Sequence, residues 1–402
     1  MRYNPDDILP KMLGRDGSFL QQEMNLKDAD ISSQLKNAKV LVIGAAGSIG
    51  ASFVRVLTGY AVKSLHLIDI SESNLAELVR DFRSAGVVLP DDFKTYAIDF
   101  SGPEMAALLD AQQYDYVLNF AALKHVRSER DPFTMMRLLE VNVLANDNLC
   151  QQLMQKADTQ MVFSVSSDKS VRPASIMGAS KAFMERVFLA NCDKLPFTSA
   201  RFANVAFSDG SLLHSFCQRL EKNQPLSAPS DVRRYFISHR EAGELCFLGC
   251  FAGLNKEIVF PQLDQTKDMM TFSEIAKLFL NHHGYEALEC ESDVEARAKS
   301  LELTTQSTQW PCHFSESDTS GEKMYEEFSD TTEVVNTTRY PNLGIVTDPT
   351  FHGSERVYEG IASINNLRAK GAWEQQELID IVSKAVPELT HVSSSKNLDQ
   401  KM

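Results

Sequence analysis

Residues 39–50 of the chain read KVLVIGAAGSIG, in which five strand-forming residues run directly into three glycines at every third position. The run KVLVI has the β-branched composition of a buried strand, and the following SIGASFVRVLTGY has the apolar spacing of a helix. Glycines between a strand and a helix allow a sharp turn whose backbone a ligand can approach closely. This feature constrains the fold strongly, because a strand followed at once by a helix is half of a parallel βαβ unit.

The same alternation continues to about residue 205. Amphipathic stretches long enough to form crossover helices separate the apolar runs, which favours parallel βαβ units. The apolar runs are residues 40–44, 64–70, 115–122, 161–167 and 197–205. We therefore predict the α/β fold class, with a Rossmann-like doubly wound parallel sheet and a smaller C-terminal substrate-binding lobe.

Changes in composition along the chain suggest four segments. Residues 1–37 are polar and mixed, which predicts an N-terminal extension with a short helix that packs on the main domain. Residues 38–205 form the predicted Rossmann domain. Residues 206–391, where prolines punctuate shorter elements, form the predicted substrate lobe, with returns to the main domain. The polar residues 392–402 are expected to be a disordered tail.

Charge and cysteine content exclude several classes of function. The 402 residues carry a formal net charge of −14, which argues against nucleic acid or an anionic membrane as a partner. No uncharged apolar window reaches the roughly 18 residues of a membrane span, and the N-terminus lacks the layout of a secretion signal. The seven scattered cysteines include no CxxC pair and predict no metal site. We therefore expect a reduced, cytoplasmic protein.

The glycine turn predicts a dinucleotide site. A pyrophosphate can lie on the N–H groups that open the helix after the turn, and Asp69, at the end of the next strand, can accept bonds from ribose hydroxyls. A carboxylate there repels a 2′-phosphate and no arginine follows it, so NAD is favoured over NADP. The alternative is a tight turn without a ligand. Asp99, at the end of the predicted third strand, could approach the adenine or cap a loop. The predicted cofactor residues are Gly44, Gly47, Ser48, Ile49, Gly50, Asp69 and Asp99.

Several motifs add a family resemblance to this pattern. The Gly-x-x-Gly-x-x-Gly spacing, the Asn-Phe-Ala-Ala segment at 119–122, Asn142 and the serine-rich strand end before Lys181 resemble the extended short-chain dehydrogenase/reductases. Five further segments resemble motifs of the nucleotide-sugar 4,6-dehydratases of bacterial polysaccharide biosynthesis. These are AALKHVRSERDP at 121–132, SSDKSVRPASIMGASK at 166–181, RFANVAFSDGSL at 201–212, DVRRYFIS at 231–238 and GEKMYEE at 321–327. The resemblance covers roughly residues 12–345 and implies a soluble relative of the membrane-anchored members.

The resemblance implies a reaction and roles in it. Bound NAD⁺ oxidises C4 of the sugar, a base removes the C5 proton, an acid protonates the departing 6-hydroxyl, and the hydride returns to C6. Asp168 is the implied acid and Lys169 the implied base, which requires a raised carboxyl pKa and a lowered ammonium pKa. Ser167, rather than Ser166, is expected to bond the 4-oxygen. Lys181 is expected to hold the nicotinamide ribose, and Ala121 to line the cofactor site.

Met177 stands where many relatives have a tyrosine that removes the 4-hydroxyl proton. Methionine carries no titratable proton, so that proton must leave through Asp168, Lys169 or a water chain, and the sequence leaves these alternatives open. The methionine is expected to fill core space. It resembles a marker of the membrane-anchored branch, which retains configuration at C5.

The resemblance also implies a substrate site. Lys124 and His125 are expected to line the sugar pocket, and Asn204 and Arg234 to meet the nucleotide diphosphate. Glu322 and Lys323 either touch the nucleotide or cap a helix.

The substrate implied most strongly is UDP-N-acetylglucosamine, with a GDP-linked analogue as the alternative, and the family tends to form homo-oligomers. Two other functions stay open. A nucleotide-sugar 4-epimerase would oxidise C4 without an acid–base pair at C5 and C6. A non-catalytic NAD-sensing module would have kept only the dinucleotide site, and Met177 is the feature that favours it.

Overall fold

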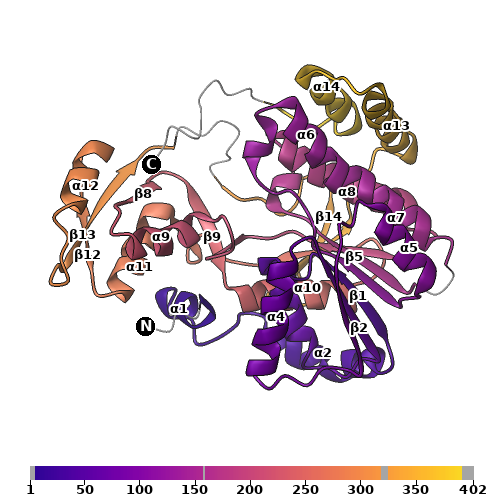
Figure 1. The fold of residues 1–402 in the computed structure, drawn as a ribbon, viewed down its shortest axis with the longest axis horizontal. Helices are drawn as coiled ribbons and strands as arrows, with labels where there is room; N and C mark the ends of the chain where they lie inside the picture. The colour runs from indigo at the N-terminus through magenta and orange to yellow at the C-terminus, as the bar shows by residue number, and fades with distance from the viewer. Residues whose placement is uncertain (1–4, 157–158, 318–324, 392–402) are drawn as a thin grey trace.

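The structure is a computed structural model that describes residues 5–156, 159–317 and 325–391. Its main sheet, within these residues, has nine strands in the order β14-β15-β10-β6-β5-β4-β1-β2-β3 (Figure 1). The strands from β3 to β10 are parallel to their neighbours, and β15 and β14 add an antiparallel edge. Their bounds are β1 Lys39–Ile43, β2 Ser64–Asp69, β3 Asp92–Ala97, β4 Tyr116–Asn119, β5 Met161–Val165, β6 Phe197–Ala200, β10 Ile258–Pro261, β14 Val334–Asn336 and β15 Leu343–Asp348. The predicted α/β fold with a large parallel sheet is confirmed.

Helices cover both faces of this sheet because its central strands are buried on both sides. Alternate residues of β1 face opposite cores: Leu41 and Ile43 pack with helix α8, whereas Val40 and Val42 pack with α3 and α10. The helices of the first face are α5 Pro103–Ala111, α6 Pro132–Leu139, α7 Ala145–Leu153 and α8 Ile176–Asn191. Those of the second are α3 Ser48–Leu57, α4 Glu72–Ser84 and α10 His239–Phe251. The strand order reverses between β1 and β4, and in such sheets ligands bind beyond the carboxyl ends of the strands at that point.

The N-terminal extension forms two helices rather than the one short helix expected. Helix α1 spans Pro5–Met12 and α2 spans Gln21–Leu35. Leu35 of α2 is buried in the main core, while Leu9 of α1 is buried among residues of the smaller lobe. The extension therefore packs on both parts of the molecule.

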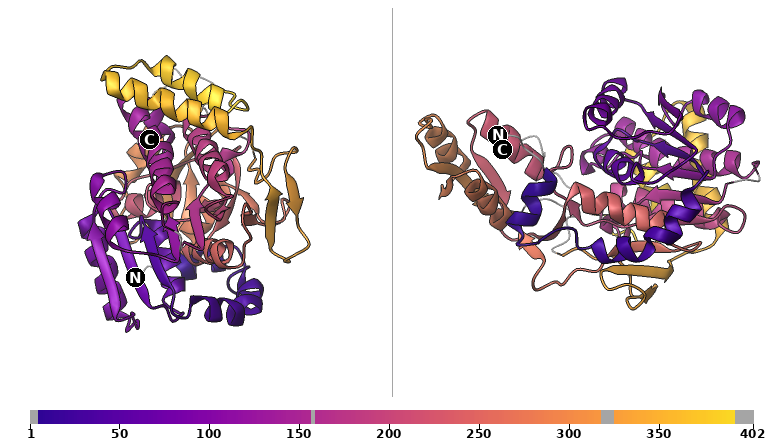
Figure 2. Two further views of the ribbon diagram at one scale, coloured as in Figure 1. Left: turned by 90° about the vertical axis from the view of Figure 1, so that its right-hand side faces the viewer. Right: turned by 90° about the horizontal axis from the view of Figure 1, so that it is seen from below.

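The smaller lobe lies beside the main sheet (Figures 1 and 2). It contains two three-stranded sheets, β11-β9-β7 and β12-β13-β8, in the described residues. Its strands are β7 Asn204–Val205, β8 Leu226–Pro229, β9 Arg233–Ile237, β11 Met269–Thr271, β12 Glu286–Glu289 and β13 Gln309–Ser315. Its helices are α9 Leu212–Glu221, α11 Phe272–His282 and α12 Asp293–Ser300. Phe216, Phe279 and Trp310 form the centre of its own hydrophobic core.

The chain after the lobe returns to the main sheet through β14 and β15 and ends in α13, Ser354–Lys370, and α14, Gln375–Ala385. Both helices pack against α8, as the yellow ribbons of Figure 2 show. Residues 206–391 thus contribute to both parts, and the domain boundaries stay a prediction. The tail 392–402 lies outside the described residues. Among the residues described, no helix is long and apolar enough to cross a membrane.

Candidate active site

The glycine turn between β1 and α3 is tightly packed at two of its three glycines. Gly44 has φ +71°, and a Cβ atom there would lie 2.6 Å from the backbone nitrogen of Ala121. A Cβ atom on Gly50 would lie 2.0 Å from the carbonyl oxygen of Gly44. Gly47 differs from both. A Cβ atom on Gly47 would lie at an ordinary contact distance of 3.6 Å from the carbonyl oxygen of Gly44, and the φ of −75° suits any residue. The fold itself therefore requires Gly44 and Gly50, whereas space beside Gly47 is open to a ligand.

Asp69 fastens this turn to the end of β2. Its Oδ2 accepts a 3.0 Å bond from the backbone N–H of Ala46, and its Oδ1 accepts a 2.9 Å bond from that of Ser71. The Asp69 residue is only 9% exposed. A carboxylate held in this way can still accept bonds from a ribose, so the turn and Asp69 together fit the adenosine half of a dinucleotide.

Ser48 and Ile49 open helix α3, where a pyrophosphate would meet free N–H groups. The Ser48 hydroxyl exchanges bonds with Asp209: it donates to the carboxylate at 2.9 Å and accepts from the backbone N–H at 2.9 Å. The loop after β7 therefore contacts the helix N-terminus, and this contact could not be read from the sequence.

Asp99 lies two residues beyond β3, not at its end as expected. Its carboxylate accepts bonds from the backbone N–H and hydroxyl of Ser101, at 2.9 and 2.7 Å, and from the Arg137 guanidinium at 2.5 Å. Partial burial alone would raise the pKa of Asp99, but the bonds from Ser101 and Arg137 outweigh it and lower that pKa. These contacts correspond to the loop-capping alternative.

The segment after β4 is held beside the glycine turn by buried asparagines. Asn119 Oδ1 accepts from the backbone N–H of Ala121 at 2.9 Å. Asn142 Oδ1 accepts from the N–H of Leu123 at 3.0 Å, and its amide donates to Leu123 O and to the Ser180 hydroxyl, both at 2.9 Å. Asn142 lies in a π-helical turn, Glu140–Leu144, a distortion often found near functional sites. It joins the β4 loop to helix α8.

The predicted acid and base lie together in a short 3₁₀ turn, Asp168–Ser170, just after β5. The Ser167 hydroxyl donates to Asp168 Oδ1 at 2.7 Å, and the Lys169 Nζ lies 3.3 Å from the same oxygen. Burial would lower the pKa of Lys169, but the carboxylates of Asp168 and Glu326 outweigh it and raise that pKa. The expectation of a lowered ammonium pKa is wrong, because the negative charges of Asp168 and Glu326 outweigh the effect of burial on Lys169.

The two serines before Asp168 have different surroundings. The Ser166 hydroxyl is 4% exposed and donates to Glu185 at 2.5 Å, so it points into the core. The Ser167 hydroxyl bonds Asp168 and is less buried. Of the two, Ser167 is the hydroxyl that contacts the Asp168–Lys169 pair.

Helix α8 packs directly on this turn. A Cβ atom on Gly178 would lie 2.3 Å from the carbonyl oxygen of Lys169, so only glycine permits the contact. Met177 is 3% exposed and lies in the main hydrophobic core, and its backbone N–H donates to Glu129 at 2.8 Å. Lys181 Nζ donates to Val165 O at 2.9 Å, and burial lowers the pKa of Lys181 to about 8.

The predicted substrate residues come from both parts of the molecule. Lys124 and His125 are exposed beyond β4. A Cβ atom on Gly210 would lie 2.6 Å from the His125 ring, so the loop after β7 lies against that ring. Their roles toward a sugar stay a prediction.

Asn204 and strand β9, which carries Arg234, are joined through a residue that sequence reasoning missed. Glu326 accepts a 2.7 Å bond from the Asn204 amide and another 2.7 Å bond from the backbone N–H of Tyr235, the residue after Arg234. Burial chiefly, with help from Asp168, raises the pKa of Glu326 to about 8, against the opposing charges of Lys169 and Arg234. The segment GEKMYEE at residues 321–327, which resembles a family motif, was the signal in the sequence that could have pointed to Glu326. Its Glu322 and Lys323 lie outside the described residues.

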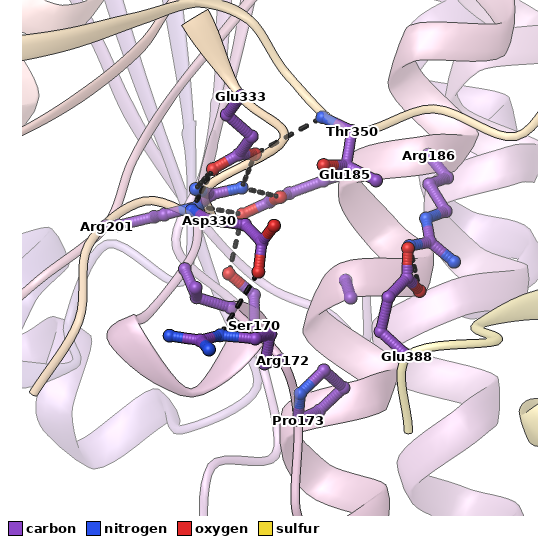
Figure 3. Close-up of a pocket in the computed structure, with 12 residues that line it drawn as sticks. Ser170, Arg172, Pro173, Glu185, Arg186, Arg201, Asp330, Glu333, Thr350 and Glu388 are labelled. Atoms are coloured by element: carbon purple, nitrogen blue, oxygen red, sulfur yellow. Dashed lines mark hydrogen bonds and ion pairs between the residues drawn. The ribbon is translucent and has the colours of Figure 1, made fainter. Parts of the chain in front are cut away.

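A buried ion network lies behind the turn that carries Asp168 and Lys169 and is shown in Figure 3. Arg201 bonds Glu185 at 2.8 Å and Glu333 at 2.7 Å, and all three side chains are almost fully buried. Glu185 also accepts from Ser170 at 2.9 Å, which ties the network to the turn. The cavity lined by these groups has a volume of only ≈ 20 Å³, too small for a nucleotide sugar. The network is therefore structural support for the site.

Comparisons with known proteins agree with this architecture. A family model described as polysaccharide biosynthesis protein matches residues 40–348, and the chain belongs to that family. The uncharacterized membrane protein MJ1061 of Methanocaldococcus jannaschii is 26% identical over 79% of this chain and 88% of that protein. The probable polysaccharide biosynthesis protein EpsC of Bacillus subtilis is 26% identical over 81% of this chain, which spans 50% of EpsC.

Solved structures show the fold alone, since their identity is low. Pen from Bacillus thuringiensis has a TM-score of 0.59 at 21% identity and covers 78% of this chain and 90% of its own. UDP-glucuronic acid 4-epimerase from Bacillus cereus, solved with UDP-glucuronic acid and NAD, has a TM-score of 0.54 at 16% identity. It covers 82% of this chain and 99% of its own.

Proposed function

We propose that this member of the polysaccharide biosynthesis protein family is an NAD-dependent nucleotide-sugar 4,6-dehydratase. Its proposed substrate is UDP-N-acetylglucosamine, and its product the 4-keto-6-deoxy sugar. The observation that carries the proposal is the Asp168–Lys169 pair after β5, packed against the helix that bears Lys181. An acid and a base side by side suit an elimination, in which a proton leaves one carbon and the hydroxyl that departs from the neighbouring carbon is protonated.

The residues of the glycine turn fit the proposed cofactor, because the space beside Gly47 is open while Gly44 and Gly50 close the turn. Asp69 would accept from the adenosine ribose, and Lys181 would hold the nicotinamide ribose. NAD⁺, when bound, supplies reversible hydride acceptance from C4 of the sugar. Asp69 favours NAD over NADP in this proposal, because its carboxylate would repel a 2′-phosphate.

Asp168 is the proposed acid that protonates the departing 6-hydroxyl, and Lys169 the base that removes the C5 proton. Since the pKa of Lys169 is raised, Lys169 must lose a proton before it can act as a base. Ser167 donates to Asp168, which offers a path for the 4-hydroxyl proton: from sugar oxygen to Ser167, and from Ser167 to Asp168. This path replaces the tyrosine that Met177 cannot supply.

The nearest alternative is a nucleotide-sugar 4-epimerase on the same fold, favoured by the likeness to the Bacillus cereus epimerase. An epimerase has no use for an acid–base pair at C5 and C6, and the Asp168–Lys169 pair is therefore the observation against it. A non-catalytic NAD-sensing module is the second alternative, and the same pair counts against it.

One incubation separates these functions. The protein is incubated with NAD⁺ and UDP-N-acetylglucosamine in D₂O, and products are followed by NMR and mass spectrometry. A dehydratase gives loss of water and deuterium at C5; an epimerase gives an isomer without loss of water; a sensing module gives no product. Lys169→Met should abolish product, whereas Lys256→Met, at a surface ion pair with Asp193, should not. Product from Lys169→Met at the wild-type rate would refute the assigned base.

A further inference from the structure

The loop after β7 brings a carboxylate of the smaller lobe to the N-terminal end of helix α3. Asp209 in this loop is exposed, and its Oδ2 accepts a 2.9 Å bond from the Ser48 hydroxyl. The backbone N–H of Asp209 donates to the same hydroxyl oxygen, also at 2.9 Å. Ser48 is the first residue of α3 and stands 161 residues before Asp209 in the chain. Folding therefore places a negative charge beside the helix end to which the cofactor's pyrophosphate is assigned.

The smaller lobe holds this loop at both ends. Phe207 is 4% exposed and packs in the hydrophobic core of the lobe, with its ring centroid 6.0 Å from that of Phe279. Its φ of +61° is unusual for a bulky residue, and such a conformation persists only where the surroundings impose it. At the other end of the loop, the Ser211 hydroxyl caps α9 by accepting from the N–H of His214 at 3.2 Å. The packing of the lobe thus presents Asp209 to α3.

The Ser48 hydroxyl has a single proton, and Asp209 accepts it. Because a hydroxyl donates only one hydrogen bond, Ser48 cannot donate to Asp209 and to a phosphate oxygen at the same time. The two acceptors also carry like charges, which repel each other at close range. The space beside Gly47 stays open next to this contact, so a pyrophosphate that enters it meets the Asp209 carboxylate.

We propose that Asp209 is a further residue of the cofactor site, which competes with the pyrophosphate for the Ser48 hydroxyl and for the N-terminal end of α3. The cofactor then binds fully only when Asp209 leaves Ser48. The next residue, Gly210, lies against the His125 ring, where a Cβ atom on the glycine would be 2.6 Å away. A shift of this loop on cofactor binding therefore reaches the loop after β4, to which the sugar is assigned. The inference rests on the proposed NAD site, but not on the reaction that follows.

Binding of adenine compounds to the full chain tests the competition, because ADP carries the pyrophosphate and adenosine lacks it. In the presence of EDTA, ADP binding is measured by calorimetry and adenosine binding by NMR titration. Asp209→Ala frees the Ser48 hydroxyl and removes the like charge, so ADP should bind about tenfold more tightly than to the wild type. Adenosine binding should stay unchanged. Asp209→Asn loses the charge but keeps an acceptor for Ser48, so its gain in ADP affinity should be smaller.

Asp81→Asn is the matched control. It removes a carboxylate that faces the same helix at Arg55, in a half-exposed ion pair of 2.8 Å, and it should bind ADP as the wild type does. Equal ADP affinity in the wild type and in Asp209→Ala would overturn the proposal. So would weaker ADP binding by Asp209→Ala in Mg²⁺, because Asp209 would then recruit a cation to the pyrophosphate instead of competing with it.

The same titrations with NAD separate this inference from the proposed reaction. NAD should follow ADP in each variant, since both carry the pyrophosphate. If NAD binds in this pattern but no dehydrated product forms, the assigned reaction is wrong and the competition stands. If neither ADP nor NAD binds to the wild type or to any variant, both the cofactor site and the competition are refuted.

Discussion

Replacing Gly50 with alanine should destabilise the fold, whereas replacing Gly47 with alanine should keep the stability and weaken NAD binding. In Gly50→Ala the new Cβ atom would lie 2.0 Å from Gly44 O and 2.9 Å from Gly44 C, both backbone atoms that cannot rotate away. Helix α3 must shift, at a cost of about 1–3 kcal/mol for overpacking, offset by about 1 kcal/mol of helix propensity. In Gly47→Ala the new Cβ meets only an ordinary contact at 3.6 Å, and the backbone conformation suits alanine. The free energy of unfolding of Gly47→Ala should stay within about 1 kcal/mol of wild type. Any change should be stabilising, because alanine lowers the conformational entropy of the unfolded chain.

Urea unfolding and NAD titration calorimetry, run on both variants, separate the two roles. Gly50→Ala should lower the free energy of unfolding by up to about 2 kcal/mol, the remainder after the helix-propensity gain. Gly47→Ala should unfold as wild type but bind NAD at least about tenfold more weakly, a loss of about 1.4 kcal/mol, because its methyl group would enter the space assigned to the pyrophosphate. Wild-type NAD affinity in Gly47→Ala would refute the reasoning that the open side of the turn holds the cofactor.

Two further predictions concern buried charges. Arg201→Met leaves Glu185 and Glu333 without their shared cation and should cost about 3–5 kcal/mol in urea unfolding. Arg55→Met, at an ion pair about half exposed, should cost no more than about 1 kcal/mol, and equal losses would contradict the structural role of the network. Lys181 has a folded pKa of about 8, below its usual value near 10.4, so the unfolded chain binds more protons between these values. The stability of wild type relative to Lys181→Met should therefore rise as pH rises through this window, and unfolding curves that keep a constant difference at pH 7.5 and 10 would refute the shift.

The parts of the site that the sequence predicted are those encoded locally. Strand β1, the glycine turn and helix α3 are contiguous, so hydrophobic period and glycine spacing suffice to place them. The Asp168–Lys169 pair follows the buried run of β5 directly, which puts it at the carboxyl end of the sheet. Asp69 is likewise predictable, because it is the last residue of the buried strand β2.

What the sequence could not predict depends on contacts between distant segments. Glu326 reaches Asn204 across 122 residues, and nothing in its own neighbourhood predicts burial. The pKa direction of Lys169 was expected wrongly because the carboxylates of its neighbour Asp168 and of the distant Glu326 together outweigh burial. The second helix of the N-terminal extension was missed because α2 is weakly amphipathic and buries only Glu23, Ile31 and Leu35.

Met177 places a constraint on any chemistry at this site. Its side chain is 3% exposed and belongs to the apolar core, and a thioether has no proton to transfer. In the proposed reaction the groups after β5 carry that proton instead, where Ser167 donates to Asp168 and Asp168 pairs with Lys169. Each of these groups bonds the next, so their protonation states depend on one another.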